Sequence, residues 1–159
     1  MEEKLDEGFI FYHVLHFLKK HGWRVIGGEP PDGTSDEVQR IVIRNSNKPK
    51  NLVNKYTQKV DLMAIKSQTL LLIELKPSFD ISDKKKLDFL NENQKDDISN
   101  AIEERTEIKR ENITHRIKCL GFSNISSYPE LDDFIVFLID KKGSVEIKKG
   151  KNISRVTFD

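Results

Sequence analysis

Three charged residues, Asp61, Glu74 and Lys76, border two apolar runs in the stretch Lys59–Lys76, KVDLMAIKSQTLLLIELK. The runs are VDLMAI and TLLLIEL, and the polar segment KSQ joins them. A charged side chain in a protein core is costly unless it is paired, hydrogen-bonded or bound to a metal. Two carboxylates without nearby cysteine or histidine suit a hard cation such as Mg²⁺, which prefers oxygen ligands. These three side chains are therefore the candidate chemical centre of the chain.

The two apolar runs predict a β-hairpin whose strands are largely buried. If the hairpin closes at Ser67 and Gln68, antiparallel pairing places Asp61 directly opposite Glu74. Side chains alternate between the two faces of a strand, so Glu74 and Lys76 are expected on the same face. Two facing carboxylates repel each other unless a cation or a proton lies between them. The hairpin therefore predicts a small patch that gathers two acids and an amine.

The spacing of the three charged residues resembles a known signature: Asp61 is followed by twelve residues and then by Glu74–Lys76 (ELK). This pattern is similar to the D…(D/E)xK signature of the PD-(D/E)xK nucleases, which have the restriction-endonuclease-like fold. Val60 stands where the family name has proline, a residue that members of the family often lack. A second triplet of this type, Glu146–Lys148, lies in a polar stretch and has no apolar run before it. The resemblance covers residues from about Glu3 to Ile108, and its specific part is the hairpin.

The resemblance implies an α/β fold with a restriction-endonuclease-like core, a central mixed β-sheet flanked by α-helices. It also implies a Mg²⁺-dependent DNA endonuclease, in which Mn²⁺ is expected to substitute for Mg²⁺. Asp61, Glu74 and the main-chain carbonyl of Leu75 would hold the metal, and Lys76 would orient or deprotonate the attacking water. The family commonly adds an acid from an N-terminal helix, and Glu7 is our prediction for it. Acids are also favourable at a helix N-terminus for electrostatic reasons alone, so that alternative stays open.

Nucleic-acid contacts are predicted from a lysine-rich stretch before the hairpin and from the segment after it, where Lys84–Lys86 lie near a helix start. The candidate residues are Lys48, Lys50, Lys55, Lys59, Lys84 and Gln94. A solvated lysine-rich loop would explain the same composition. The formal net charge of +1 is low for a protein that holds DNA by itself. The cations must therefore be gathered on one face, doubled in a homodimer or supplied by a partner.

The composition fits one domain over residues 1–159, with 36% hydrophobic and 33% charged residues. The single cysteine, Cys119, excludes an internal disulfide and a cysteine cluster for zinc. No apolar run approaches the roughly 20 residues that span a bilayer. The N-terminal sequence MEEKLDEG is acidic, unlike a signal peptide. We therefore expect a cytoplasmic protein with no membrane partner.

Apolar spacing predicts the remaining elements. The predicted helices span Glu3–His21 and Lys85–Ile108, the second one capped by Ser82 or Asp83, with a break or shorter helix in Arg110–Cys119. The predicted strands outside the hairpin are Trp23–Ile26, Ile41–Arg44, Phe134–Asp140, Val145–Lys148 and, at an edge of the sheet, Ile153–Phe158.

The sequence favours a restriction-type or defence-type nuclease, or its cleavage subunit, acting as a homodimer or within a larger complex. One alternative is a structure-specific enzyme such as a Holliday junction resolvase or a repair nickase. Another is a non-catalytic nucleic-acid-binding module of nuclease fold. A third is a structural role, in which Lys76 forms an internal ion pair with Glu74 or Asp61. The lack of aromatic pairs for base stacking favours duplex DNA over RNA, which stays open as a substrate.

Overall fold

A six-stranded mixed β-sheet forms the centre of the protein, in a computed structural model that describes residues 5–31, 38–46, 57–153, 156 and 158. In spatial order the strands are β1 (Arg24–Gly28), β4 (Leu62–Lys66), β5 (Thr69–Leu75), β6 (His115–Ser123), β7 (Phe134–Ile139) and β8 (Val145–Lys149). The adjacent strands β5, β6 and β7 run parallel to one another, while β1, β4 and β8 are antiparallel to their neighbours. A separate two-stranded ladder consists of β2 (Val42–Arg44) and β3 (Thr57–Lys59).

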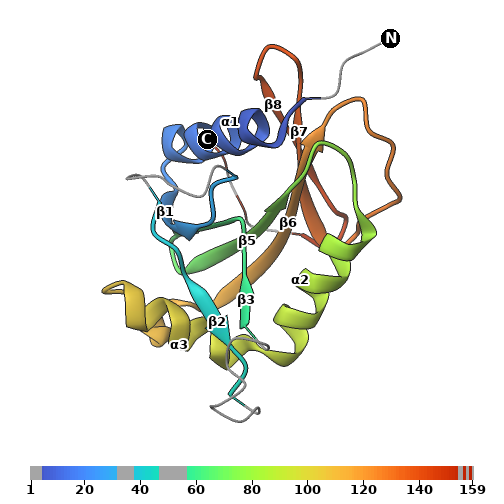
Figure 1. Cartoon of the computed structure of the whole chain (residues 1–159). Coiled ribbons are helices and arrows are strands. Elements are labelled where there is room, and N and C mark those ends of the chain that lie inside the picture. Colours follow the sequence, from blue (N-terminus) through green and yellow to red (C-terminus); the bar gives the residue numbers. More distant parts are fainter. Residues whose placement is uncertain (1–4, 32–37, 47–56, 154–155, 157, 159) are drawn as a thin grey trace.

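Helices cover both faces of this sheet (Figure 1). One face packs against α1 (Glu7–Lys20), and the other against α2 (Ile81–Asn93) and α3 (Lys95–Arg105). Residues of β5 alternate between the two cores, with Leu71 and Ile73 on the α1 side. The protein is therefore an α/β domain with a mixed sheet between helices, as predicted.

The β4–β5 hairpin closes at Ser67 and Gln68, as predicted. Both turn residues have positive φ, 49° and 69°, the conformation of a two-residue turn that matches the twist of the strands. The paired residues run from Lys66 opposite Thr69 to Leu62 opposite Ile73. The next pair in this register is Asp61 and Glu74.

The first helix begins later than predicted. Asp6 is its N-cap, and the carboxylate accepts a hydrogen bond of 2.7 Å from the Phe9 N–H. The helix ends before Gly22, whose φ of 82° favours glycine. The predicted end at His21 is confirmed within one residue, whereas the predicted start at Glu3 lies outside the described residues.

The prediction of one helix over residues 85–108 is wrong in two respects. The helix already begins at Ile81, because Asp80 rather than Ser82 or Asp83 caps it. It is then divided at Gln94, where the backbone leaves the helical region with φ −131° and ψ 32°. The apolar stripe continues through both helices, which is why the spacing alone does not reveal the break.

The segment Arg110–Cys119 differs most from its prediction, which is a break or a shorter helix. A single 3₁₀ turn, Arg110–Asn112, leads into β6, a long strand in the middle of the sheet. Cys119 faces the α1 core, while Leu120 and Phe122 face the opposite core.

The last strands are partly as predicted. The predicted strands at Phe134–Asp140 and Val145–Lys148 are confirmed as β7 and β8. The edge strand predicted at Ile153–Phe158 is not found in its described residues, Ile153, Val156 and Phe158, and β8 is the edge of the described sheet. Apolar side chains in that segment pack on the α1 core instead, with the Phe158 ring stacked 5.5 Å from Trp23. Within the described ranges, every helix is too short or too polar to cross a lipid bilayer.

Candidate functional site

The carboxylates of Asp61 and Glu74 lie together where β4 begins and β5 ends. Asp61 donates its main-chain N–H to Glu74 Oε2 at 2.8 Å, and Leu75 donates its N–H to Asp61 Oδ2, also at 2.8 Å. Each acid is thus fixed by the main chain of the opposite strand. Glu74 is only 4% exposed, and Asp61 is half-buried. The structure brings the two acids together, as the hairpin register predicts.

The main-chain carbonyl of Leu75 is the third oxygen source predicted for a metal. The N–H and C=O groups of one residue in a strand point to the same side, and the Leu75 N–H points at Asp61. The neighbouring Lys76 N–H instead donates to the Gly121 carbonyl on β6, at 3.1 Å. The two carboxylates therefore lie together at one end of β5, and the Leu75 carbonyl leaves the strand on the same side as the Leu75 N–H.

Burial and mutual repulsion disfavour two charges in this pair. Burial is the largest cause that raises the pKa of Asp61 from 3.8 to about 8, and the charge of Glu74 is the second. The hydrogen bond from the Leu75 N–H and the charge of Lys86 lower the same pKa, but they do not outweigh burial. At neutral pH the metal-free pair therefore holds a proton, and the site accommodates added positive charge.

A lysine from α2 supplies part of that positive charge. Lys86 Nζ lies 2.5 Å from Glu74 Oε1 and also donates to the main-chain carbonyl of Lys59 on β3. Lys86 belongs to the run Lys84–Lys86, for which the sequence predicts phosphate contacts, and its contact with Glu74 is not part of that prediction. A signal was present, because Lys86 lies one helical turn before the inward-facing Leu90. With the correct helix start, Lys86 and Asp83 extend the buried stripe of α2 toward the site.

Lys76 is directed to the start of α2. Its ammonium lies 2.7 Å from Asp80 Oδ2 and 3.2 Å from Asp83 Oδ1. The hydrogen bond with Asp80 is the largest cause that raises the pKa of Lys76. Burial, followed by the charge of Glu74, raises the pKa of Asp83. The alternative in which Lys76 pairs with Glu74 or Asp61 is therefore wrong: in the described residues Lys86 pairs with Glu74.

The additional acid predicted on the first helix is not in contact with this cluster. Glu7 is exposed in the first turn of α1, which packs on the sheet face opposite α2. The hydrogen bonds and ion pairs found among the described residues do not join Glu7 to Asp61 or Glu74. Its participation stays a prediction.

Two of the predicted nucleic-acid residues in the described part of the chain already have acidic partners. Lys59 Nζ lies 3.5 Å from Glu29, and Lys84 Nζ lies 2.8 Å from Asp88. Both ion pairs are partly exposed, so each lysine can exchange its partner for a phosphate at small cost. The remaining predicted lysines lie outside the described residues: Lys48, Lys50 and Lys55.

Gln94 is buried between two helices and does not reach the protein surface. It is 3% exposed, and its amide donates to Asp97 Oδ2 at 3.2 Å, at the junction of α2 and α3. A phosphate outside the protein has no access to a side chain buried in this way. The phosphate contact predicted for Gln94 therefore has no support, and its polarity is explained by the break between the helices.

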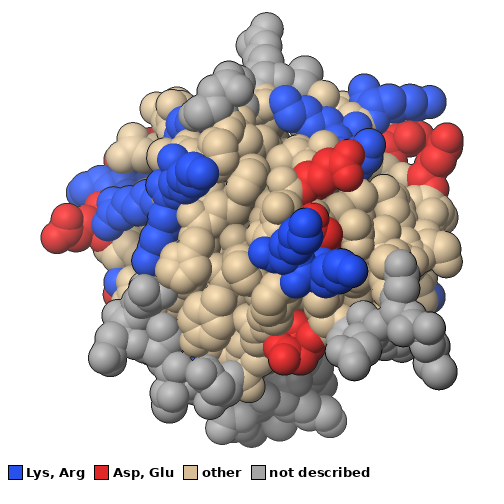
Figure 2. Space-filling view, turned by 90° about the horizontal axis from the view of Figure 1, so that it is seen from above, with Lys and Arg blue, Asp and Glu red and all other residues tan. Residues whose placement is uncertain are grey.

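The surface shown in Figure 2 carries basic and acidic side chains in small mixed clusters, which wide neutral areas separate. No continuous basic area is visible on the described part of this face. This distribution agrees with the formal net charge of +1. A long strand of phosphates would find few uninterrupted cations there.

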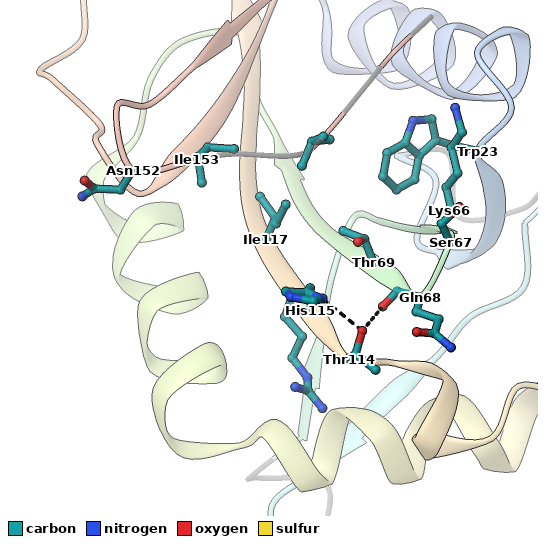
Figure 3. Close-up of a pocket in the computed structure, with 12 residues that line it drawn as sticks. Trp23, Lys66, Ser67, Gln68, Thr69, Thr114, His115, Ile117, Asn152 and Ile153 are labelled. Carbon is teal, nitrogen blue, oxygen red and sulfur yellow. Dashed lines mark hydrogen bonds between the residues drawn. The ribbon is translucent and has the colours of Figure 1, made fainter.

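A cavity of about 680 Å³ lies at the other end of β5 (Figure 3). Thr69, the first residue of β5, lines it, whereas Glu74 lies five residues further along the strand. At the usual rise per residue this separation is roughly 16 Å. Other lining residues include Trp23, Lys66, Gln68, Thr114 and His115. The cavity is therefore separate from the carboxylate pair.

Comparisons with protein-family models, with curated proteins and with solved structures find no match. Among the described residues, no group of three or more His, Cys, Asp or Glu side chains is placed to hold a metal ion. The candidate site consequently depends on two carboxylates, Asp61 and Glu74, and one main-chain carbonyl, that of Leu75. This set of hard oxygen donors suits Mg²⁺ or Mn²⁺ rather than a softer metal.

Proposed function

We propose that this protein is a Mg²⁺-dependent DNA endonuclease of the PD-(D/E)xK type, a restriction-type or defence-type nuclease or its cleavage subunit. The observation that carries the proposal is the pair formed by Asp61 and Glu74 at the end of the hairpin, with Lys76 directly after β5. The helix directly after this strand covers the sheet face that carries Glu74, an arrangement that supports a restriction-endonuclease-like core.

Asp61, Glu74 and the Leu75 carbonyl would bind the metal. Mg²⁺ held there would polarise a phosphate oxygen and lower the pKa of a bound water. The two carboxylates favour this cation because burial, and then the charge of Glu74, disfavour the ionised form of Asp61 and raise its pKa. Their exchange of hydrogen bonds with the opposite strand keeps both side chains in place before a metal arrives.

Lys76 would orient the attacking water and offset the negative charge that develops on the phosphorus centre. The Lys76 side chain is 37% exposed, and the side chain of the neighbouring Asp80 is 38% exposed. An exposed ion pair of this kind contributes little free energy, so a phosphate can replace Asp80 as the partner of Lys76. Asp83, on the more buried side, keeps the lysine close to the end of β5 during that exchange.

The proposed substrate is duplex DNA in the cytoplasm. The low net charge and the mixed surface in Figure 2 favour a homodimer, or a subunit whose partner supplies further phosphate contacts. Two protomers would also allow each one to cut a single strand of a duplex.

One observation favours a second candidate, a non-catalytic nucleic-acid-binding module of the same fold. Both oxygens of Glu74 already accept hydrogen bonds, one from Lys86 and one from the Asp61 N–H. A site that never releases Lys86 would bind no metal. Metal-dependent cleavage distinguishes the two candidates.

The test is cleavage of supercoiled plasmid and phage DNA by wild type, Lys76→Ala and Glu74→Gln in Mg²⁺, Mn²⁺ or EDTA. We expect metal-dependent cleavage by wild type and a loss of about a hundredfold or more in both variants. Lys95→Ala is the control, because Lys95 is exposed at the start of α3 and is not among the predicted nucleic-acid contacts. Discrete fragments would identify a sequence-specific enzyme. Nicking or smearing would identify a structure-specific enzyme, or a subunit that lacks its partner. Equal cleavage by wild type and the two site variants would refute the proposal.

A further inference from the structure

We infer that Lys86 is a positioning residue of the proposed metal site. Its ammonium occupies the cation position at Glu74 and competes with a divalent ion for that position. This inference rests on the proposed function and deepens it. It assigns a role to a second lysine that the D…ExK pattern does not contain.

The first argument is the occupancy of Glu74. Oε2 accepts the Asp61 N–H at 2.8 Å, and Oε1 lies 2.5 Å from Lys86 Nζ. The N–H belongs to the main chain at the start of β4, so its loss would disturb the hairpin. The ammonium stands on a flexible four-carbon stem and can leave without any change in the backbone. A cation that binds Glu74 therefore displaces Lys86.

The second argument is that Lys86 lies in the site rather than beside it. Its ammonium is bonded both to Glu74 on β5 and to the Lys59 carbonyl on β3, two residues before Asp61. The Lys86 side chain is 26% exposed, whereas the Glu74 side chain is 4% exposed. The displaced lysine thus has a path to solvent, while the acid has none. A divalent ion and an ammonium at the same carboxylate also repel each other, which makes the two ligands mutually exclusive.

The third argument comes from the contrast with neighbouring lysines. Lys76 contacts Asp80 and Asp83, and Lys84 contacts Asp88. Neither is bonded to the Asp61–Glu74 pair in the described structure. Lys86 alone among these three balances the buried charge when no metal is present. Metal affinity is therefore set partly by the strength with which Lys86 holds Glu74.

The experiment is a calorimetric titration of the full chain with Mn²⁺ at one neutral pH, comparing wild type with Lys86→Met. We expect Lys86→Met to bind Mn²⁺ about tenfold more tightly, because it loses a charge-assisted hydrogen bond that competes with the metal. Lys85→Met removes the same charge from the same helix without touching Glu74, and we expect less than about a twofold change. Lys86→Arg keeps a competing cation, so its affinity for Mn²⁺ should remain near that of wild type. Circular dichroism melting checks that each variant is folded, and Lys86→Gln serves as a second neutral variant.

Glu74→Gln separates failure of this inference from failure of the proposed function. If Glu74→Gln abolishes a saturable Mn²⁺ site while Lys86→Met binds no more tightly than wild type, the metal site stands and the role of Lys86 is refuted. Equal tightening in Lys85→Met would refute it as well, because the effect would then be one of net charge. Absence of saturable binding in both wild type and Lys86→Met would refute the metal site itself and the inference with it.

Discussion

Replacing Asp61 with asparagine should change how the stability of the metal-free protein depends on pH. The folded protein keeps a proton on Asp61 that the unfolded chain releases, because burial and Glu74 raise its pKa from 3.8 to about 8. The free energy of unfolding therefore falls as pH rises from about 4 to about 8, and this contribution is constant at higher pH. Asparagine is neutral throughout and can still accept the hydrogen bond from Leu75.

The magnitude follows from the two pKa values. Each pH unit between 3.8 and about 8 lowers the free energy of unfolding by about 1.4 kcal/mol, an upper limit of about 6 kcal/mol in total. Asp61 is only half-buried, so water and local relaxation stabilise part of the charge that appears when Asp61 ionises. We therefore expect wild type to lose about 2–3 kcal/mol between about pH 5 and pH 8.5 relative to Asp61→Asn.

The assay is urea unfolding of wild type and Asp61→Asn in EDTA at several pH values, followed by the fluorescence of the buried Trp23. Asp96→Asn is the control, because Asp96 is exposed in the first turn of α3. The difference between Asp61→Asn and wild type should grow with pH, and that between Asp96→Asn and wild type should not. Parallel curves for wild type and Asp61→Asn would refute the reasoning about the carboxylate pair.

Two further predictions concern the sheet around the site. Asp88→Asn should destabilise the protein by about 1–2 kcal/mol at neutral pH and far less near pH 3, measured by urea unfolding at both. Burial alone would raise the pKa of Asp88, but the hydrogen bonds from Lys118 and Lys84 outweigh burial and lower this pKa. The stability that the Asp88 carboxylate contributes is therefore lost as pH falls. An equal loss of stability in Asp88→Asn at both pH values would contradict this prediction. Gly121→Ala should cost about 1–3 kcal/mol in thermal unfolding, because the new Cβ would overlap Leu75 Cδ2 at the end of β5. Gly8→Ala, where a Cβ would lie 3.5 Å from its nearest neighbour, should not lower stability, and a similar loss there would show that the overlap is not the cause.

The hairpin could be predicted because its determinants are local. Apolar runs on both sides of a two-residue turn specify the strands and their register, and the register alone places Asp61 opposite Glu74. The position of Lys86 could not be predicted in the same way. It depends on where α2 begins, which the cap at Asp80 determines, and on how the helix is rotated when Leu87 and Leu90 pack into the core.

The sequence does not predict strand β6, because two of the strand positions that face the helices hold basic residues. Arg116 donates to Ser99 Oγ at 3.0 Å, and Lys118 lies 2.7 Å from Asp88. These partners come from α3 and α2, so the pairing that makes a basic residue acceptable in a central strand is tertiary. A pattern of alternating apolar residues interrupted by such charges resembles a loop until the partners are known.

The reciprocal bonds between Asp61 and the end of β5 have a consequence for the order of folding. The two acids are separated by only 13 positions along the chain, and a hairpin of this kind closes within microseconds. The parallel pairing of Thr69 with His115, by contrast, spans two helices and closes a much longer loop. We therefore expect the hairpin that holds Asp61 and Glu74 to be among the first parts of the chain to assemble, while water still surrounds the two carboxylates and their repulsion is weak. The helix that later covers Glu74 brings its own counter-ion, Lys86, in the same movement that removes the water.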